Sequence, residues 1–328
     1  MKKGTDLGQL EMVSIESLVK EDHVYRKYHE ILDFDKLTEN LDKKLTKNLG
    51  ATGYGINRLF KILLLQVMED LSDRELEKYI EENTAAKYFC GFGLTERTPG
   101  YSLFSKVRKK IGTNQLSSIF KEVRQMLKQS GYMSEVFNFV DASHLVSKNN
   151  LWKERDKAIQ EKYEKLNNEV LPKVAKDQQA RIGSKGKNKF WYGYKKHISV
   201  DMQSGLINKV AITPANVTDA KGLKHVCPSQ GMVFADKGYC TNDAQQIIKQ
   251  KGCADGTIKK NNMKCKNKDQ DKWRTKIRAP YERVFSKTSH RVRYKGIQKN
   301  QFYAFMEAMS HNLKRLIVLD APPLNPIS

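Results

Sequence analysis

The stretch Val136-Phe-Asn-Phe-Val-Asp141-Ala is an apolar run that ends in a carboxylate. Its aromatic and β-branched residues favour a short strand, and Phe139-Val140 directly before the acid indicates that this strand is buried. A second run, Gly231-Met-Val-Phe-Ala-Asp236, repeats the pattern downstream. Functional groups in open α/β sheets collect at the carboxyl ends of strands, so these two acids are candidate site residues.

The elements around these runs predict a mixed α/β domain over residues 131–328. Residues 194–213 alternate on either side of Gln203-Ser204-Gly205, which predicts a hairpin. A charged segment at about 149–180 has helical periodicity and is expected to be an insertion after the first strand. Further helices are expected after Thr218 and Thr241, since Thr is a common N-cap.

Residues 1–130 have a different pattern, with helical periodicity throughout. Ser72 followed by Glu75 matches a capping box at the start of one helix. We therefore expect an all-helical N-terminal module over residues 1–130. The pattern fits a DNA-binding unit and a helical scaffold equally well.

The net charge is concentrated in the α/β part. The 328 residues include 59 Lys and Arg against 37 Asp and Glu, which gives +22 at pH 7. Residues 1–130 hold 22 basic and 19 acidic residues, whereas residues 131–328 hold 37 and 18. A regional excess of this size favours a nucleic acid partner, because a phosphate backbone attracts it. A solubilising surface or an acidic protein partner is the alternative.

Other features argue against a membrane or secreted protein. The longest apolar run, Ile62-Leu-Leu-Leu65, is far shorter than a membrane span, and the first residues contain no apolar leader. The five cysteines form no Cys-x-x-Cys pair, so reduced thiols are expected. We predict a cytoplasmic location.

Two stretches of the α/β part are strongly basic. Residues 181–197 contain six basic residues and an aromatic cluster around Trp191, which suits phosphate contacts and base stacking or, alternatively, a strand against the core. Residues 272–299 contain ten basic residues and Glu282 as the one acid. An isolated carboxylate in such surroundings suggests a specific role.

That role is either an ion pair or a metal site. Glu282 has Arg278 and Arg283 as nearby ion-pair partners. Together with Asp141 and Asp236 it would instead supply the carboxylate oxygens that Mg²⁺ prefers. We favour the metal site.

Five motifs occur in an order that resembles the DDE transposases of bacterial insertion sequences, of the insertion-sequence-five type. Two upstream segments, Leu71-Ser-Asp-Arg-Glu-Leu and Thr98-Pro-Gly-Tyr-Ser-Leu-Phe-Ser-Lys-Val-Arg, resemble the helical module of that group. The five motifs are Phe139-Val-Asp-Ala-Ser, Tyr192-Gly-Tyr-Lys-Lys-His-Ile-Ser-Val-Asp, Thr213-Pro-Ala-Asn-Val-Thr-Asp, Ala235-Asp-Lys-Gly-Tyr and Arg278-Ala-Pro-Tyr-Glu-Arg-Val-Phe.

The resemblance implies a ribonuclease-H-like catalytic core. In it, Asp141 lies on the first strand, Asp236 follows the fourth, and Glu282 lies on a late helix, and the three acids bind two Mg²⁺ or Mn²⁺ ions. The family signature Tyr-x2-Arg-x3-Glu-x6-Lys is matched at its Arg and Glu, whereas Thr275 and Ser289 replace its Tyr and Lys.

The implied activity is DNA strand cleavage at the ends of an insertion sequence, followed by strand transfer into target DNA. The implied partners are terminal inverted repeats and target DNA, with a dimer or larger oligomer on the DNA in the bacterial nucleoid. A metal nuclease without strand transfer and an inactive, transposase-derived DNA-binding protein are the alternatives. The basic residues expected to contact DNA are Arg278, Arg283, Lys287, Lys195, Lys196 and Lys237.

Overall fold

The computed structural model describes residues 12–46, 53–148, 151–186, 188–261, 263, 267–286 and 290–324. The chain forms two compact units, Met1–Lys110 and Ile111–Ser328. The helices are α1 (Ile15–Leu18), α2 (Val24–Ile31), α3 (Phe34–Thr46), α4 (Ile56–Met68), α5 (Asp73–Glu82), α6 (Thr84–Cys90), α7 (Tyr101–Gln129), α8 (Leu151–Gln160), α9 (Leu171–Val174), α10 (Asp219–Val226), the 3₁₀ helix η1 (Lys237–Tyr239), α11 (Asn242–Gln250), α12 (Lys268–Ser286) and α13 (Ile297–Val318). The strands are β1 (Phe137–Val146), β2 (Arg181–Lys185), β3 (Lys189–Asp201), β4 (Ile207–Pro214), β5 (Met232–Phe234) and β6 (Ala254–Asp255).

The described residues of the first unit form helices joined by loops. Helix α4 is buried over most of its length, which explains its nearly continuous apolar sequence. Helix α5 begins with the expected capping box, in which Ser72 Oγ accepts from the Glu75 N–H and the Glu75 carboxylate accepts from the Ser72 N–H. The expected all-helical N-terminal region is confirmed.

Helix α7 spans the division between the two units. It is interrupted at Gly112, whose φ of 68° and ψ of 164° are not helical. The division falls after Lys110, earlier than the expected boundary at residue 130. The part of α7 that follows Gly112 packs within the second unit, where the Phe120 ring lies 5.4 Å from the Phe305 ring. Helical periodicity alone does not show which unit a helix packs against.

The second unit is built on one mixed sheet. Its order is β2-β3-β1-β5-β6, with β4 also paired to β3. Strand β1 is antiparallel to β3 and parallel to β5, and β5 is parallel to β6. The expected hairpin is confirmed as β3 and β4. Strand β2 was not expected, so Asp236 follows the fifth strand in chain order and not the fourth. The mixed α/β fold with a ribonuclease-H-like core is confirmed.

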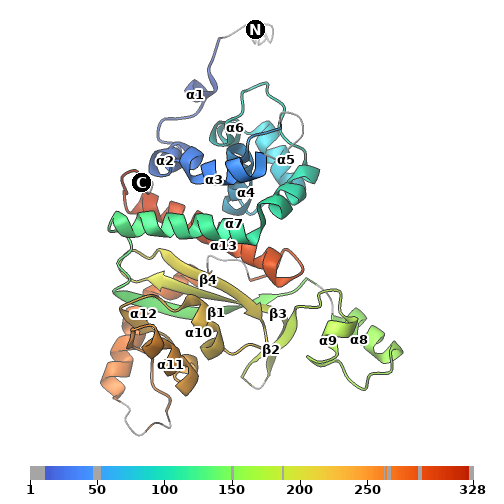
Figure 1. Cartoon of the computed structure of the whole chain (residues 1–328), viewed down its shortest axis with the longest axis vertical. Coiled ribbons are helices and arrows are strands. Elements are labelled where there is room, and N and C mark those ends of the chain that lie inside the picture. Colours follow the sequence, from blue (N-terminus) through green and yellow to red (C-terminus); the bar gives the residue numbers. More distant parts are fainter. Residues whose placement is uncertain are drawn as a thin grey trace, which may run out of the picture. The chain divides into compact units, whose positions relative to one another are not determined.

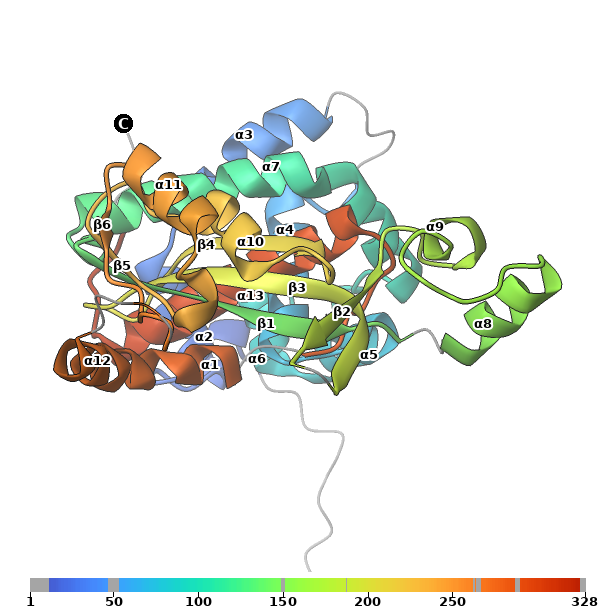
Figure 2. The same ribbon diagram turned by 90° about the horizontal axis from the view of Figure 1, so that it is seen from below.

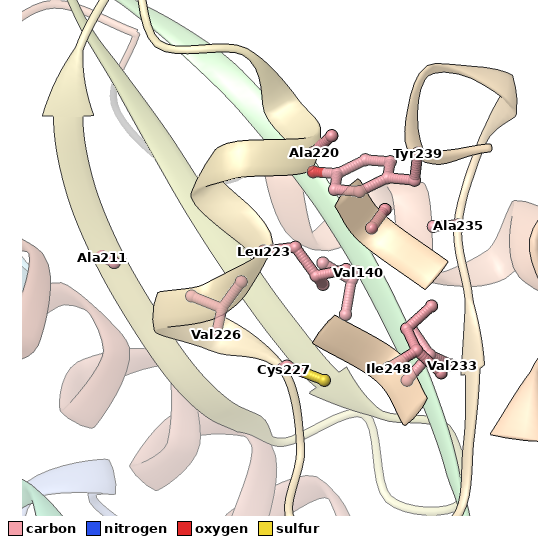
Figure 3. Close-up of a cluster of buried hydrophobic side chains, with 11 residues drawn as sticks. Val140, Ala211, Ala220, Leu223, Val226, Cys227, Val233, Ala235, Tyr239 and Ile248 are labelled. Atoms are coloured by element: carbon pink, nitrogen blue, oxygen red, sulfur yellow. The ribbon is translucent and has the colours of Figure 1, made fainter. Parts of the chain in front are cut away.

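Helices cover both faces of the sheet. Helix α13 and the second part of α7 lie along one face, and α10 and α11 lie along the other (Figure 1). Under α10 and α11, Val140 of β1 packs with Leu223 and Ile248 in a buried apolar cluster (Figure 3). Side chains alternate along a strand, so Phe139 and Asp141 point to the opposite face from Val140. The sheet thereby holds the candidate acid of β1 away from this cluster.

The expected charged insertion contains α8 and α9 and lies beside the β2–β3 ribbon, which Figure 2 shows extending from the sheet. The Asn168 side chain joins the two by accepting from the Ile182 N–H and donating to the Ile182 C=O. No helix in the described part of the chain is long and apolar enough to cross a membrane.

Candidate active site

The backbone register places Asp141 beside Asp236. Strands β1 and β5 run parallel, and Phe139 pairs with Phe234 at the end of their ladder. Each aspartate lies two residues beyond this last pair, on the same side of its strand as the paired Phe. Strand β5 ends there while β1 continues to Val146, which forms a parallel bridge with Arg291.

The surroundings of Asp141 disfavour its charged form. Burial, and after it the negative charges of Asp236 and Asp219, raise the pKa of this carboxyl to about 6. A hydrogen bond of 2.7 Å from the Ala142 N–H to Oδ1 and the positive charge of Arg278 act in the opposite direction. The site therefore carries an excess of negative charge that a bound cation would neutralise.

Substituting Asp141 by Asn should raise the free energy of unfolding at about pH 8 by on the order of 2 kcal/mol when no divalent cation is present. The folded protein keeps the Asp141 proton up to about pH 6, whereas the unfolded chain loses it near the ordinary pKa of 3.8. Raising the pH between these values therefore destabilises the wild type and not the variant. Urea unfolding in EDTA at about pH 8 and at about pH 4 measures the difference, which should nearly vanish at the lower pH. An equal difference at both pH values would contradict this explanation.

Asp236 is fixed by the backbone that follows it. It is the N-cap of η1, and its Oδ1 accepts from the Gly238 N–H at 2.8 Å. A Cβ on Gly238 would lie 3.0 Å from this oxygen, closer than nearly all real contacts. Glycine at position 238 therefore lets the turn close around the carboxylate.

A third carboxylate, Asp219, lies near this pair, and the sequence analysis assigned it no role. It is the first residue of α10, after the N-cap Thr218. Its Oδ1 pairs with Lys195 Nζ at 2.8 Å, and its Oδ2 lies 3.8 Å from the place that a Gly238 Cβ would occupy. Asp219 ends the motif Thr213-Pro-Ala-Asn-Val-Thr-Asp, but an acid in the first turn of a helix is common for its effect on the helix dipole, so the motif did not mark it as a site residue.

Glu282 does not join the two aspartates in this structure. Its Oε1 pairs with Arg278 Nη2 at 3.0 Å, one turn earlier on α12, and the carboxylate is half exposed. Among the described residues, no three Asp, Glu, His or Cys side chains lie close enough to hold one metal ion. The ion pair with Arg278, one of the two alternatives read from the sequence, is present.

Arg278 lies between the two parts of the site. Its guanidinium lies 5.9 Å from the centre of the Phe139 ring, and its charge lowers the pKa of Asp141. The Nε and Nη1 groups of Arg278 are buried and have no hydrogen-bond partner among the described residues. Two unused donors beside the aspartates suit an anionic oxygen, such as that of a phosphate.

The other expected DNA contacts differ in their exposure. The expectation for Lys196 is corrected: its side chain is 2% exposed and pairs with Glu307 at 2.6 Å, so it is not available to DNA. Lys195 is also largely buried, in its pair with Asp219. Lys237 and Arg283 are exposed. Lys287 lies outside the described residues.

Comparison with known proteins identifies the family. Residues 138–313 match the family described as "Transposase DDE domain", and residues 13–110 match "Transposase domain (DUF772)". The first match covers more than half of the chain, and the chain therefore belongs to the DDE transposase family.

Solved transposase structures show weak similarity. The cryo-EM structure of a piggyBac transposase synaptic complex with hairpin DNA is 8% identical with a TM-score of 0.37, over 93% of this chain and 76% of that chain. A Mos1 transposase paired-end complex with the left transposon end is 7% identical with a TM-score of 0.18, over 88% of each chain. These TM-scores are too low to support an argument about this protein.

Proposed function

We propose that this transposase-family protein cleaves DNA strands at the ends of an insertion sequence and transfers the freed 3′ ends to target DNA. The observation that supports this most directly is the placement of Asp141 and Asp236 side by side at the end of the β1–β5 ladder. The basic excess of residues 131–328 supports DNA as the substrate.

The donor set of the site fits a divalent cation. Carboxylate oxygens are the preferred ligands of Mg²⁺ and Mn²⁺, and the pKa of Asp141 is raised first by burial and then by the negative charges of Asp236 and Asp219. Asp141 and Asp236 would hold the metal. Glu282 would become the third carboxylate ligand once its ion pair with Arg278 is broken. When bound, two such ions supply a Lewis acid and lower the pKa of water.

The remaining residues act on the DNA. Release of Glu282 would leave Arg278 with a full set of donors for a phosphate oxygen next to the aspartates. Lys237 and Arg283 have exposed side chains. In the sequence they directly follow Asp236 and Glu282, and Lys287 lies four residues after Arg283. We assign these three side chains to flanking phosphates, which they would neutralise. Acting on two DNA ends requires at least two active sites, so we propose a dimer or larger assembly on DNA.

The test is a cleavage and joining assay with the full chain. The substrates are labelled DNA that carries the sequences flanking the gene on both sides and a supercoiled target plasmid, with Mg²⁺ or Mn²⁺. The proposal expects nicks at defined end positions and labelled 3′ ends joined to the plasmid. Cleavage without joining would indicate a nuclease, and binding without cleavage a DNA-binding protein, and either result would overturn the proposal.

DNA binding by this protein should weaken steeply as salt is added. A surface that neutralises six to ten phosphates loses roughly a thousandfold or more in affinity between about 50 and 200 mM salt. Replacing Lys237 or Arg283 with Ala should each lower the slope of log K against log salt by about one. Fluorescence anisotropy with labelled DNA measures the slope. A flat response in the wild type would contradict binding through phosphate contacts.

A further inference from the structure

Two exposed histidines stack on each other beyond the end of β5. The ring centres of His144, on β1, and His290 lie 5.7 Å apart, and the rings are nearly parallel. The Trp191 ring of β3 lies 5.7 Å from His144 on another side. Side chains alternate along β1, so His144 points to the same face of the sheet as Val140, the face that carries α10. The proposed reaction assigns no role to these histidines.

The tip of the β2–β3 ribbon adds two lysines to this group. Lys185 and Lys189, the tip lysines, are directly opposite each other in the register, and both side chains are exposed. Lys189 and Trp191 are two residues apart on β3, so they point to the same face. Like charges directly opposite on paired strands repel each other, and neither lysine forms an ion pair with another described residue. An anion bound between the tip lysines would relieve this repulsion.

The charges that act on His144 are all positive. Burial lowers the pKa of His144, and the charges of His290 and of the two tip lysines lower it further. Lys195 lies opposite His144 in the register and pairs with Asp219 at 2.8 Å, so this acid is already engaged by another cation. The cluster therefore lacks a counter-ion of its own.

Close packing holds the ribbon in place beneath the tip lysines. A Cβ on Gly183 of β2 would lie 2.5 Å from the Ala215 backbone oxygen and 2.8 Å from Trp191 Cζ2. The Trp191 indole N–H also donates to the Tyr194 C=O at 3.1 Å, which fixes the ring beside His144. Trp191 is thus part of the support, and the ribbon extends from the sheet with its lysines already positioned (Figure 2).

We propose that this cluster is a binding site for one backbone phosphate of duplex DNA, formed by His144, His290, Lys185 and Lys189. This inference rests on the proposed function, which supplies DNA as the substrate. Ammonium and imidazole N–H groups both donate to phosphate oxygens. His144 follows Asp141 by three residues, about 10 Å along the strand, which equals about three base-pair steps. A duplex bound at the aspartates is therefore long enough to reach the cluster.

The first test compares the double variant Lys185→Gln/Lys189→Gln with a charge-matched control, Lys249→Gln/Lys251→Gln. The control lysines are also exposed, but they directly precede β6 and so lie at the opposite end of the parallel strands from the aspartates. Fluorescence anisotropy measures the affinity of the full chain for a labelled duplex with the flanking sequence, in EDTA and at several salt concentrations.

The tip variant should lower the slope of log K against log salt by about two, because two phosphate-neutralising cations are lost. The control should keep the slope of the wild type. An equal loss of slope in the two variants would show a general effect of net charge and would overturn the inference.

His144→Gln gives an independent result. A bound phosphate favours the protonated imidazole, so DNA binding should raise the pKa of His144 and the affinity of the wild type should increase from about pH 8 to about pH 6. This gain should be about three- to tenfold smaller in His144→Gln, because glutamine takes up no proton. The same gain in the variant as in the wild type would overturn the site.

The salt response of the wild type separates this inference from the proposed function. If its affinity for DNA falls steeply with salt and the tip variant keeps the full slope, the phosphate site fails while the proposed function stands. If the wild type shows no salt-dependent binding to DNA, the proposed substrate is wrong and the phosphate site fails with it.

Discussion

Asp141→Asn and Asp236→Asn are each expected to lower the rate of DNA strand cleavage at least about a thousandfold, because a catalytic metal site contributes several kcal/mol to lowering the barrier. Asparagine has nearly the shape of aspartate but lacks the negative charge that holds a divalent cation. Both side chains sit at the end of the β1–β5 ladder, where the backbone fixes their separation. Cleavage of labelled end DNA in Mg²⁺ measures the loss, and DNA affinity should change little.

Asp255→Asn is a matched control for these substitutions. Asp255 ends β6, the strand next to β5, and thus also stands at a strand terminus. Its carboxylate is engaged by Thr257 and Lys259. Cleavage should therefore survive in this variant. Loss of cleavage in Asp255→Asn, or its retention in either of the other two variants, would contradict the assignment of the site.

The third acid is tested by comparing Glu282→Gln with Asp219→Asn. We expect Glu282→Gln to lose cleavage to the same degree as the two aspartate variants and Asp219→Asn to lose less. Glu282 pairs with Arg278 in this structure, whereas Asp219 is held by Lys195. If Asp219→Asn is inactive while Glu282→Gln still cleaves, Asp219 is the third ligand and the role of Glu282 is wrong.

Lys196→Met is expected to lower the free energy of unfolding by about 3–5 kcal/mol. The ammonium group is buried and lies 2.6 Å from Glu307 Oε2, and burial lowers its pKa. Methionine fills similar space but leaves the Glu307 carboxylate without this cation. Urea unfolding followed by circular dichroism measures the loss.

A double variant serves as the control for this pair. Lys196→Met combined with Glu307→Leu should recover much of the lost stability, since the second substitution also removes the carboxylate that has lost the Lys196 cation. The salt dependence of DNA binding should remain as in the wild type at temperatures where the protein is folded. If Lys196→Met unfolds like the wild type but binds DNA more weakly, Lys196 contacts DNA and its exclusion from the DNA contacts is wrong.

The sequence predicted the class of fold and pointed to the two aspartates as candidate site residues. An apolar run that ends in an acid is a local pattern, and it occurs twice, at Asp141 and at Asp236. Their proximity, however, depends on β1 and β5 being neighbours in parallel register, which is a property of the sheet. Strand β2 was missed because its five residues contain Gly, Ser and Lys, which lack the alternating pattern of a half-buried strand.

Lysines 195 and 196 show why charge alone predicts contacts poorly. The sequence shows them as part of one basic run, but adjacent residues of a strand point to opposite faces of the sheet. Lys195 therefore reaches Asp219 at the start of α10, and Lys196 reaches Glu307 on α13. Both acids lie far along the chain, so no local pattern revealed either pair. The exposure of a basic side chain depends on the partner that the fold brings to it.

Because β1 pairs directly with β5, the distance between the two aspartates does not depend on how many residues connect them in the sequence. Asp141 and Asp236 are joined by the insertion with α8 and α9, the β2–β3 ribbon and α10, yet their spacing is set by backbone hydrogen bonds between two neighbouring strands. The insertion with α8 and α9 lies outside this strand pairing, so it can grow, shrink or be exchanged during evolution without moving the two carboxylates.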